Sequence, residues 1–501
     1  MPARKAYCLI LSLSVFLGPC RVATAKSGPT DAAKAGQQAQ KEDDLKELND
    51  QIRREKFDMV LPEAMRKNKV DMWIHVMEIA IPDEFGAEEL GSTSGIFAFT
   101  DRGGDRIERA VLGRRWGADQ SDWGAGDQDY KLVEECGAYD IIEKPIFVKE
   151  PLASPMTEYD FRFKGLREFV EARDPKKIAV NFMLNLGPWE TYTDFGGSRD
   201  GLSHTDYLLL AQELGEKYAG RIVSSEYVMM DYIIRKVPSE IQFLKKLRQD
   251  QVDLVKKVFA GIVPGVTKTR ELVPGDVQSV DRDVDVTVFR RMRTGLSQRG
   301  RSAGWENSVV QGGDIVAAPS QGMYAYVLRE GETEPPQEIK KLWAEYLKID
   351  KVLAENIKAG LTPRAIMQKV KRNFEEAGII VRDDQLHMVQ PKDNWPVYSA
   401  GFDPERTELS IDCHGMMKGA RKSPEENYFG PRISSYGPTW TWDIPLPPYH
   451  HFVLEYFFYM PSPGPEGQDQ YLFWWDHEQA LATERGVEYL SPGQKELYLI
   501  R

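Results

Sequence analysis

Two glutamates near the carboxyl end of the chain are the first candidates for chemistry. Glu455 lies among aromatic residues in the apolar run 452–460, and Glu478 lies in the run 471–483. Both runs have the length and composition of strands. A carboxylate on such a strand is either solvated or buried for a purpose. Buried carboxylates can hold a cation, bind a cationic ligand or exchange a proton, so metal binding, ligand binding and hydrolysis are the chemistries to weigh.

The alternation of side chains along a strand indicates which neighbours could join these glutamates. His451 and Glu455 are separated by an even number of positions, so both could line one face. Asp476 shares the face of Glu478 in the same way. His477 then points away from Glu478, which indicates a structural role for this histidine.

Two folding patterns follow one another in the part of the chain that must position these residues. In residues 45–235, strand-like runs alternate with helix-like runs, which predicts an α/β domain. In residues 236–501, long helices come first and strands later, which predicts an α+β domain. The strand-like runs of the first domain are 72–80, 96–99 and 177–181.

Helix starts can also be located from residue spacing. Ser239 and Gln242 have the spacing of a capping box at the start of the second domain. Apolar residues then recur at helical spacing as far as Phe259. Thr362 followed by Pro363 predicts a further helix start, because proline is tolerated at the first helical position.

The amino-terminal residues have the pattern of a secretory signal peptide. Residues 1–25 combine a short basic start, an apolar run and the small residues Ala23-Thr24-Ala25. The apolar run is too short to cross a bilayer comfortably, although an uncleaved anchor remains the alternative. We expect a secreted or periplasmic protein with no membrane span after signal removal. Residues 26–44 carry no large apolar residue and predict a disordered leader.

Charge and cysteine content narrow the partners. The formal net charge is -12, which argues against binding to nucleic acid. Cys8 and Cys20 belong to the predicted signal peptide, which leaves Cys136 and Cys413. These two could pair in an oxidising compartment. Two buried free thiols are the favoured interpretation, since nothing in the sequence fixes their distance.

Five segments of the second domain, taken in order, resemble one family. Their sequences and spacing are similar to those of Xaa-Pro aminopeptidases, prolidases and creatinases. The resemblance implies a creatinase-type N-terminal domain at 45–235 and a pita-bread domain at 236–501. It also suggests a homodimer, because members of this family often dimerise. The segments are 236–244, 313–316, 325–332, 430–433 and 478–488.

The resemblance also implies a set of metal ligands, most of which this chain lacks. Family members hold two ions of manganese, cobalt or zinc with two aspartates, one histidine and two glutamates. The glutamate positions match Glu455 and Glu478, and the histidine position falls on Asn427. The segment from Ile315 to Ala325, where both aspartates belong, contains no carboxylate.

These losses lead to definite expectations for the site. Glu455 and Glu478 should face one cavity, bind substrate together with Asn427, and hold a metal ion only weakly. We expect no metal at full occupancy, and two divalent ions if the protein is active. His414 resembles a histidine that some members carry shortly before the metal histidine. His414 and His451 are therefore the candidate catalytic residues.

Three functions are consistent with this pattern. The first is a degenerate, non-hydrolytic member, a pseudoenzyme that binds a peptide or a small cationic ligand. The second is an active Xaa-Pro aminopeptidase or dipeptidase for peptides with proline in second position, with substitute ligands among Asp412, Asp443 and His414. The third is a metal-free, creatinase-like hydrolase in which Glu455 and Glu478 hold a cationic substrate.

Overall fold

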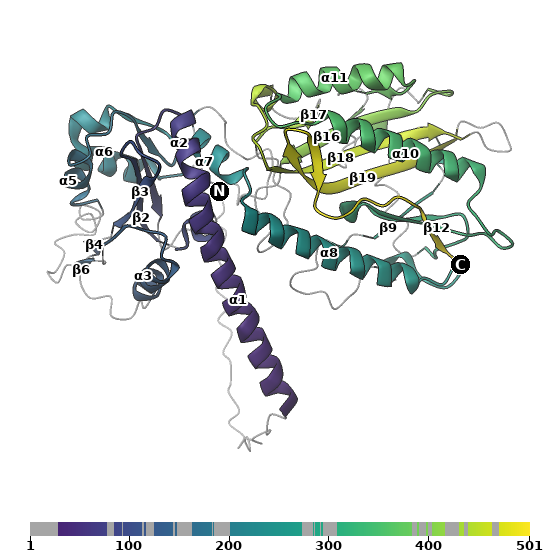
Figure 1. Ribbon diagram of the computed structural model, residues 1–501, viewed down its shortest axis with the longest axis horizontal. Coiled ribbons are helices and arrows are strands. Elements are labelled where there is room, and N and C mark those ends of the chain that lie inside the picture. Colours follow the sequence, from purple (N-terminus) through teal and green to yellow (C-terminus); the bar gives the residue numbers. More distant parts are fainter. Residues whose placement is uncertain are drawn as a thin grey trace, which may run out of the picture. The chain divides into compact units, whose positions relative to one another are not determined.

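The structure is a computed structural model, shown in Figure 1. Its contacts divide the chain into two compact units, Met1–Glu47 and Leu48–Arg501. The predicted signal peptide, residues 1–25, lies outside the described residues and stays a prediction. The residues described are 29–77, 85–92, 94–112, 115–116, 125–143, 146–147, 163–182, 184, 201–272, 284, 286–290, 292–293, 308–382, 388–389, 397–398, 403–415, 430–434, 439–462 and 470–501.

The first helix differs from what the sequence suggested. Helix α1 (Pro29–Met59) includes most of the stretch 26–44 that was expected to be a disordered leader. Ala, Gln and Lys make up about half of this stretch, and all three are strong helix formers. Local propensity therefore accounts for a helix that has no apolar stripe in its first half. None of the helices described combines the length and the apolar content that a membrane crossing needs.

A six-stranded mixed sheet organises the residues before position 235. Its strand order is β5-β3-β2-β1-β7-β8. The strands are β1 (Met72–Met77), β2 (Gly95–Asp101), β3 (Ile107–Leu112), β5 (Ile141–Ile142), β7 (Ile178–Val180) and β8 (Ile222–Ser224). A separate pair is formed by β4 (Arg115–Trp116) and β6 (Ile146–Phe147).

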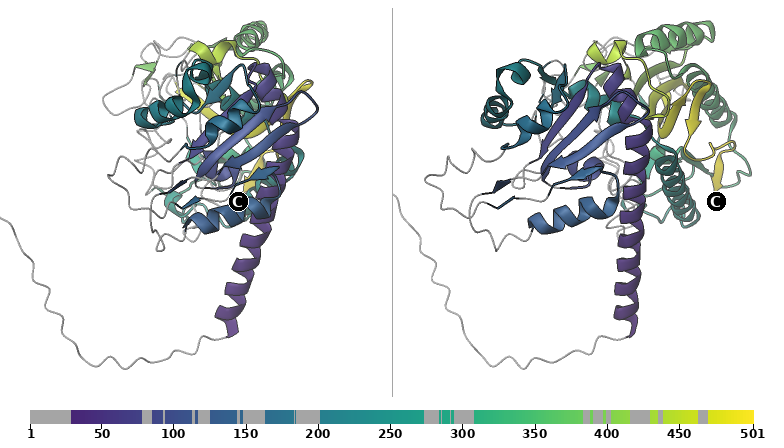
Figure 2. Two further views of the ribbon diagram at one scale, coloured as in Figure 1. Left: turned by 90° about the vertical axis from the view of Figure 1, so that its left-hand side faces the viewer. Right: turned by 60° about the vertical axis from the view of Figure 1, so that its left-hand side comes forward.

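Helices cover both faces of this sheet (Figure 2). Trp73 and Phe99 pack with α2, α3 and α7, whereas Ile74 and Ala98 pack with α5 and α6. Strand residues that alternate between two apolar faces are expected where a sheet is buried on both sides. The predicted α/β class is confirmed for this part of the chain. The helices are α2 (Leu61–Lys67), η1 (Gly86–Leu90), α3 (Ala125–Cys136), α5 (Leu166–Glu171), α6 (His204–Ala219) and α7 (Glu226–Ile233).

Two further sheets organise the residues after position 236. A seven-stranded sheet has the order β10-β19-β18-β16-β13, with β17 paired to β16 and β20 paired to β19. A four-stranded sheet has the order β21-β12-β11-β9, and β14 pairs with β15. The strands are β9 (Thr287–Phe289), β10 (Met292–Arg293), β11 (Ile315–Ala318), β12 (Met323–Val327), β13 (Ile380–Val381), β14 (Met388–Val389), β15 (Val397–Tyr398), β16 (Glu408–Gly415), β17 (Ile433–Ser434), β18 (His450–Pro461), β19 (Gln470–Thr483), β20 (Gly486–Tyr489) and β21 (Tyr498–Ile500).

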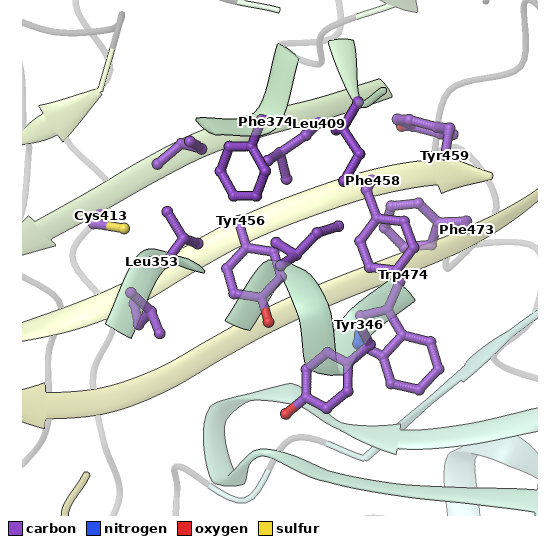
Figure 3. Close-up of a cluster of buried hydrophobic side chains, with 14 of the residues drawn as sticks. Tyr346, Leu353, Phe374, Leu409, Cys413, Tyr456, Phe458, Tyr459, Phe473 and Trp474 are labelled. Atoms are coloured by element: carbon purple, nitrogen blue, oxygen red, sulfur yellow. The ribbon is translucent and has the colours of Figure 1, made fainter. Parts of the chain in front are cut away.

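The largest core lies between the seven-stranded sheet and helices α10 and α11. Figure 3 shows Tyr456, Phe458 and Trp474 in one cluster with Tyr346 and Phe374 of these helices. Strands β9 to β12 lie between α8 and α10, so the helices do not all precede the strands as the sequence predicts. Helices packed on a largely antiparallel sheet nevertheless confirm the predicted α+β class. The helical segments are α8 (Pro238–Ala260), η3 (Thr269–Glu271), η4 (Pro319–Gln321), α10 (Gln337–Asn356), α11 (Pro363–Glu376) and η6 (Thr439–Asp443).

One predicted helix start is confirmed and one is wrong. Thr362 caps α11 and accepts a hydrogen bond from the Ala365 backbone N–H at 3.3 Å. The predicted capping box at Ser239 does not form, because α8 begins at Pro238 and has no side-chain cap. The Ser239 hydroxyl instead donates to Glu55. A tertiary contact has replaced the local one.

Candidate functional site

Strands β18 and β19 bring two candidate groups directly opposite each other. In their antiparallel register Glu455 pairs with His477, and Leu454 pairs with Glu478. Opposed residues of an antiparallel pair project from the same face, and successive residues project from opposite faces. Glu455 therefore shares a face with His477, while Glu478 lies on the other face.

The neighbouring strand β16 supplies a third group to the face of Glu455. His414 pairs with Val453, which is an even number of positions from Glu455. His414 Nε2 lies 3.2 Å from Glu455 Oε2. One ligand atom each from His414, Glu455 and His477 lie within 4.8 Å of one another. We call these three residues the three-donor cluster.

The hydrogen bonds around His414 determine which of its nitrogens faces the cluster. His414 Nδ1 lies 3.3 Å from the backbone oxygen of Gly415. A carbonyl oxygen only accepts, so this contact places a proton on Nδ1. In a neutral ring, the lone pair of Nε2 then faces the carboxylate oxygen of Glu455. Two acceptors at this separation repel each other unless a proton or a metal ion lies between them.

The other two members are also held by neighbours. Trp475 Nε1 donates to Glu455 Oε1 at 3.2 Å. Ser320 Oγ lies 3.4 Å from His477 Nδ1. Both histidines are buried, whereas the Glu455 side chain is 18% exposed. Solvent thus reaches the cluster at its carboxylate.

The donor set fits one divalent transition metal ion. Two imidazoles and one carboxylate suit zinc and its neighbours, and the same set holds the single zinc ion of thermolysin-type enzymes. His414, Glu455 and His477 would hold the ion. When bound, such an ion supplies a Lewis acid with a coordination position left for a ligand.

A second ion does not fit the described residues. The hairpin β11–η4–β12 is the segment where the family's aspartates belong, and it brings a hydroxyl, Ser320, to the cluster in place of carboxylates. Asp314 just before it is held by Arg290 through two contacts of 2.8 Å. The dinuclear centre implied by the resemblance therefore lacks its ligands here.

Two of the suggested substitute ligands serve other partners. Both oxygens of Asp412 accept from Arg432, at 2.7 and 2.6 Å. Both oxygens of Asp443 accept from Arg364, at 2.7 and 2.9 Å. Of the three suggested substitutes, His414 is the one that the structure places in the cluster.

Glu478 belongs to a different environment. It is buried with Asp476, and Tyr324 donates to Asp476 Oδ1 at 2.6 Å while Ser491 donates to Glu478 Oε1 at 3.2 Å. Burial raises the pKa of Glu478 to about 8, and the charge of Asp350 adds to this effect. Burial also raises the pKa of Asp476.

The expectation that Glu455 and Glu478 face one cavity is therefore wrong. The two residues come from neighbouring strands, but the register places them one residue out of step and hence on opposite faces. Glu478 lies instead beside Asp476, as the alternation along the strand predicted.

His451 does not join the cluster. Asn427 lies outside the described residues, so its substrate-binding role stays a prediction. His451 is fully buried, and burial lowers its pKa, with the charges of Lys236 and Arg248 adding to the effect. A histidine held neutral in this way lies on the same strand face as Glu455, yet outside the group of ligand atoms that converge.

Sequence reasoning missed His477, Ser320 and Trp475. Alternation along β19 correctly separates His477 from Glu478, but it does not show which of the two faces Glu455. The pairing of β18 with β19 decides this. The midpoint of the sequence between these two strands could have predicted the register. With a loop centred near residue 466, positions 455 and 477 are opposed.

Comparisons with known proteins find solved structures that match most of the chain at low identity. The chain is similar to an Xaa-Pro dipeptidase from Bacillus anthracis, with 16% identity, 90% of this chain and 99% of that chain covered, and a TM-score of 0.45. X-Pro aminopeptidase from Thermotoga maritima MSB8 is 15% identical, with 87% of this chain and 100% of that chain covered and a TM-score of 0.47. Aminopeptidase P from E. coli is 10% identical, with 87% of this chain and 94% of that chain covered and a TM-score of 0.45. Neither a protein-family model nor a curated protein sequence matches this chain.

Proposed function

We propose that this protein is an Xaa-Pro peptidase-like protein that binds one divalent transition metal ion and does not act as a dinuclear peptidase. The observation that carries the proposal is the three-donor cluster of His414, Glu455 and His477, whose ligand atoms lie within 4.8 Å of one another. The sequence segments that resemble the Xaa-Pro peptidase family supply the family part of the proposal.

The loss of the dinuclear mechanism follows from the ligand count. Dinuclear peptidases use two ions to activate a bridging water and to hold the tetrahedral intermediate. The hairpin β11–η4–β12 brings Ser320 to the cluster and offers no carboxylate for the second ion. One ion on two imidazoles and Glu455 can still bind a peptide carbonyl or carboxylate.

A peptide is therefore the proposed natural ligand, with its amino terminus or a carboxylate at the ion. The partly exposed Glu455 carboxylate gives such a ligand access. The signal-like residues 1–25 make export to the periplasm or the cell exterior part of the proposal. A homodimer is proposed on the sequence resemblance alone.

A second function is favoured by one specific observation. Two histidines and one glutamate form the ligand set of single-zinc hydrolases. An Xaa-Pro peptidase that works with one ion would use the same residues. Hydrolysis of a peptide with proline in second position, dependent on a single zinc ion, separates this function from binding alone.

Elemental analysis of the purified protein tests the proposal. The protein is incubated with zinc, cobalt or manganese, freed of excess metal and analysed for bound ion. We expect one ion of zinc or cobalt per chain, and none in Glu455→Gln. Glu478→Gln is the matched control, because it makes the same change one register step away on the opposite face, and it should bind as the wild type does.

The outcomes are distinct. Two ions per chain, or none, would overturn the proposal. Equal loss in both glutamine variants would show that the opposite-face assignment is wrong. One ion together with turnover of an Xaa-Pro peptide would replace the binding function by the single-zinc peptidase.

A further inference from the structure

We infer that Trp475 is the positioning residue of the three-donor cluster, whose indole N–H holds one oxygen of Glu455 and thereby leaves the other as a single-oxygen metal ligand. This inference rests on the proposed function, because it concerns the ion bound there. It adds a selectivity: the site should favour small ions that accept few oxygen ligands, such as zinc, over manganese.

The geometry gives the two oxygens of Glu455 different partners. Oε1 accepts from Trp475 Nε1 at 3.2 Å, and Oε2 lies 3.2 Å from His414 Nε2. Trp475 precedes His477 by two positions on β19, so both project from the same face. Their ring centroids are 5.5 Å apart. The indole thus borders the cluster and contacts one of its three members through a hydrogen bond.

The indole N–H is a suitable group for this task. It donates one hydrogen bond and carries no charge, so it neither neutralises Glu455 nor engages the second carboxylate oxygen. Asp412 shows the contrasting case, because Arg432 engages both of its oxygens at 2.7 and 2.6 Å and neutralises it. A neutral single donor orients a carboxylate without removing it as a ligand.

Burial alone does not explain this hydrogen bond. The adjacent Trp474 is fully buried, and its Nε1 has no hydrogen-bond partner among the described residues. Trp475 is only half-buried, so its N–H could be satisfied by water. The strand thus tolerates an indole without a partner on its covered face and directs the accessible one to Glu455.

Restricting Glu455 to one oxygen has consequences for the bound ion. Larger or harder ions take more oxygen ligands and often bind a carboxylate through both oxygens. Zinc is satisfied by four ligands, of which nitrogen donors are preferred partners. Partners that orient a metal ligand typically contribute a factor of about 10 to 100 in metal affinity.

The test compares Trp475→Phe with Trp343→Phe by competition for zinc and manganese and by the visible spectrum of bound cobalt. Trp343 also loses an indole N–H hydrogen bond, to the Lys495 carbonyl at 3.3 Å, so it is the matched control. In Trp475→Phe we expect zinc affinity to fall about 10- to 100-fold, the zinc preference over manganese to narrow, and the cobalt bands to weaken as coordination number rises. Trp475→Gln, which restores an N–H donor, should recover part of the selectivity.

Each result decides one claim. Wild-type protein that binds no ion would sink the proposed function, and this inference with it. Wild-type protein that binds one ion, with Trp475→Phe unchanged in affinity, selectivity and spectrum, would overturn the inference alone. Weaker binding in Trp475→Phe with unchanged selectivity and spectrum would also overturn it, because that is the signature of a structural residue.

Discussion

The two faces of strands β18 and β19 have opposite roles although they share one backbone. One face carries the three-donor cluster with the half-buried Trp475 at its border. The other carries Tyr456, Phe458 and Trp474 into the core under α10 and α11 (Figure 3). A shift of one residue in sequence separates a member of the three-donor cluster from a core residue, so register, more than composition, decides which side chains meet here.

The largest expected effect is on stability, and it concerns the face of β18 and β19 that packs under α10 and α11. Trp474→Ala should lower the free energy of unfolding by about 3 to 5 kcal/mol, because it removes a fully buried indole from the core. The Trp474 ring lies 4.2 Å from that of Tyr324 and 5.1 Å from that of Tyr346. Urea denaturation measures the change. Trp475→Ala is the comparison, and an equal loss there would contradict the difference between the faces.

The next largest effect is on zinc affinity, and it concerns the face of β18 and β19 that carries the three-donor cluster. His477→Ala should lower zinc affinity at least about 100-fold, or roughly 3 kcal/mol, because one of three donors is lost. Isothermal titration with zinc measures the change. His204→Ala provides a control, since His204 is exposed at the start of α6. Wild-type affinity in His477→Ala would remove His477 from the site.

The pH dependence of the free energy of unfolding should again distinguish the face of β18 and β19 that packs against α10 and α11. Burial raises the pKa of Asp350 from 3.8 to about 6, and the hydroxyl of Tyr489 lowers it in part. A carboxyl pKa raised by folding contributes stability that is fully present below pH 3.8 and is lost as the pH rises through about 6.

Asp350→Asn should abolish this loss. With allowance for partial solvent access, we expect the free energy of unfolding of the variant to exceed that of the wild type by roughly 2 kcal/mol above pH 7. The difference should shrink to nothing near pH 3.8, the starting pKa of the group. Thermal unfolding across this pH range measures it. A constant difference at all pH values would show that the Asp350 charge is not its cause.

The smallest expected effect concerns Ser320. Its hydroxyl is 3.4 Å from His477 Nδ1, a long contact that should orient the ring only weakly. Ser320→Ala should reduce zinc affinity about three-fold, below the range typical of well-formed supporting hydrogen bonds. Ser491→Ala makes the same change beside Glu478 and should leave zinc titration unaltered.

Local patterns predicted the elements better than the site. The apolar runs at 452–460 and 471–483 became β18 and β19, and alternation placed Asp476 beside Glu478. These features depend on neighbours in sequence, which hydrophobic periodicity reports directly. The start of α8 was missed because Ser239 contacts Glu55, far away in the chain.

The site itself depended on pairings that no single strand encodes. Glu455 and His414 were identified as candidates, and the structure brings both into the cluster. The sequence predicts a structural role for His477, because this residue points away from Glu478, which matches the family's last ligand position. Glu478 and His477 are adjacent in sequence, but adjacent residues of a strand project from opposite faces of the sheet. Choosing Glu478 in place of His477 therefore placed the ligand on the wrong face.

The hairpin β11–η4–β12 has a consequence for how the molecule behaves in a crowded solution. The outer edge of β19 is paired with β10 at one end and with β20 at the other. Between them η4 packs against the strand, and the Tyr324 hydroxyl lies 2.9 Å from the Trp475 carbonyl oxygen. An open strand edge invites pairing with another chain and aggregation. A hairpin that offers no carboxylate to a metal still shields this edge, so removing it would expose an unpaired stretch of β19 to other chains.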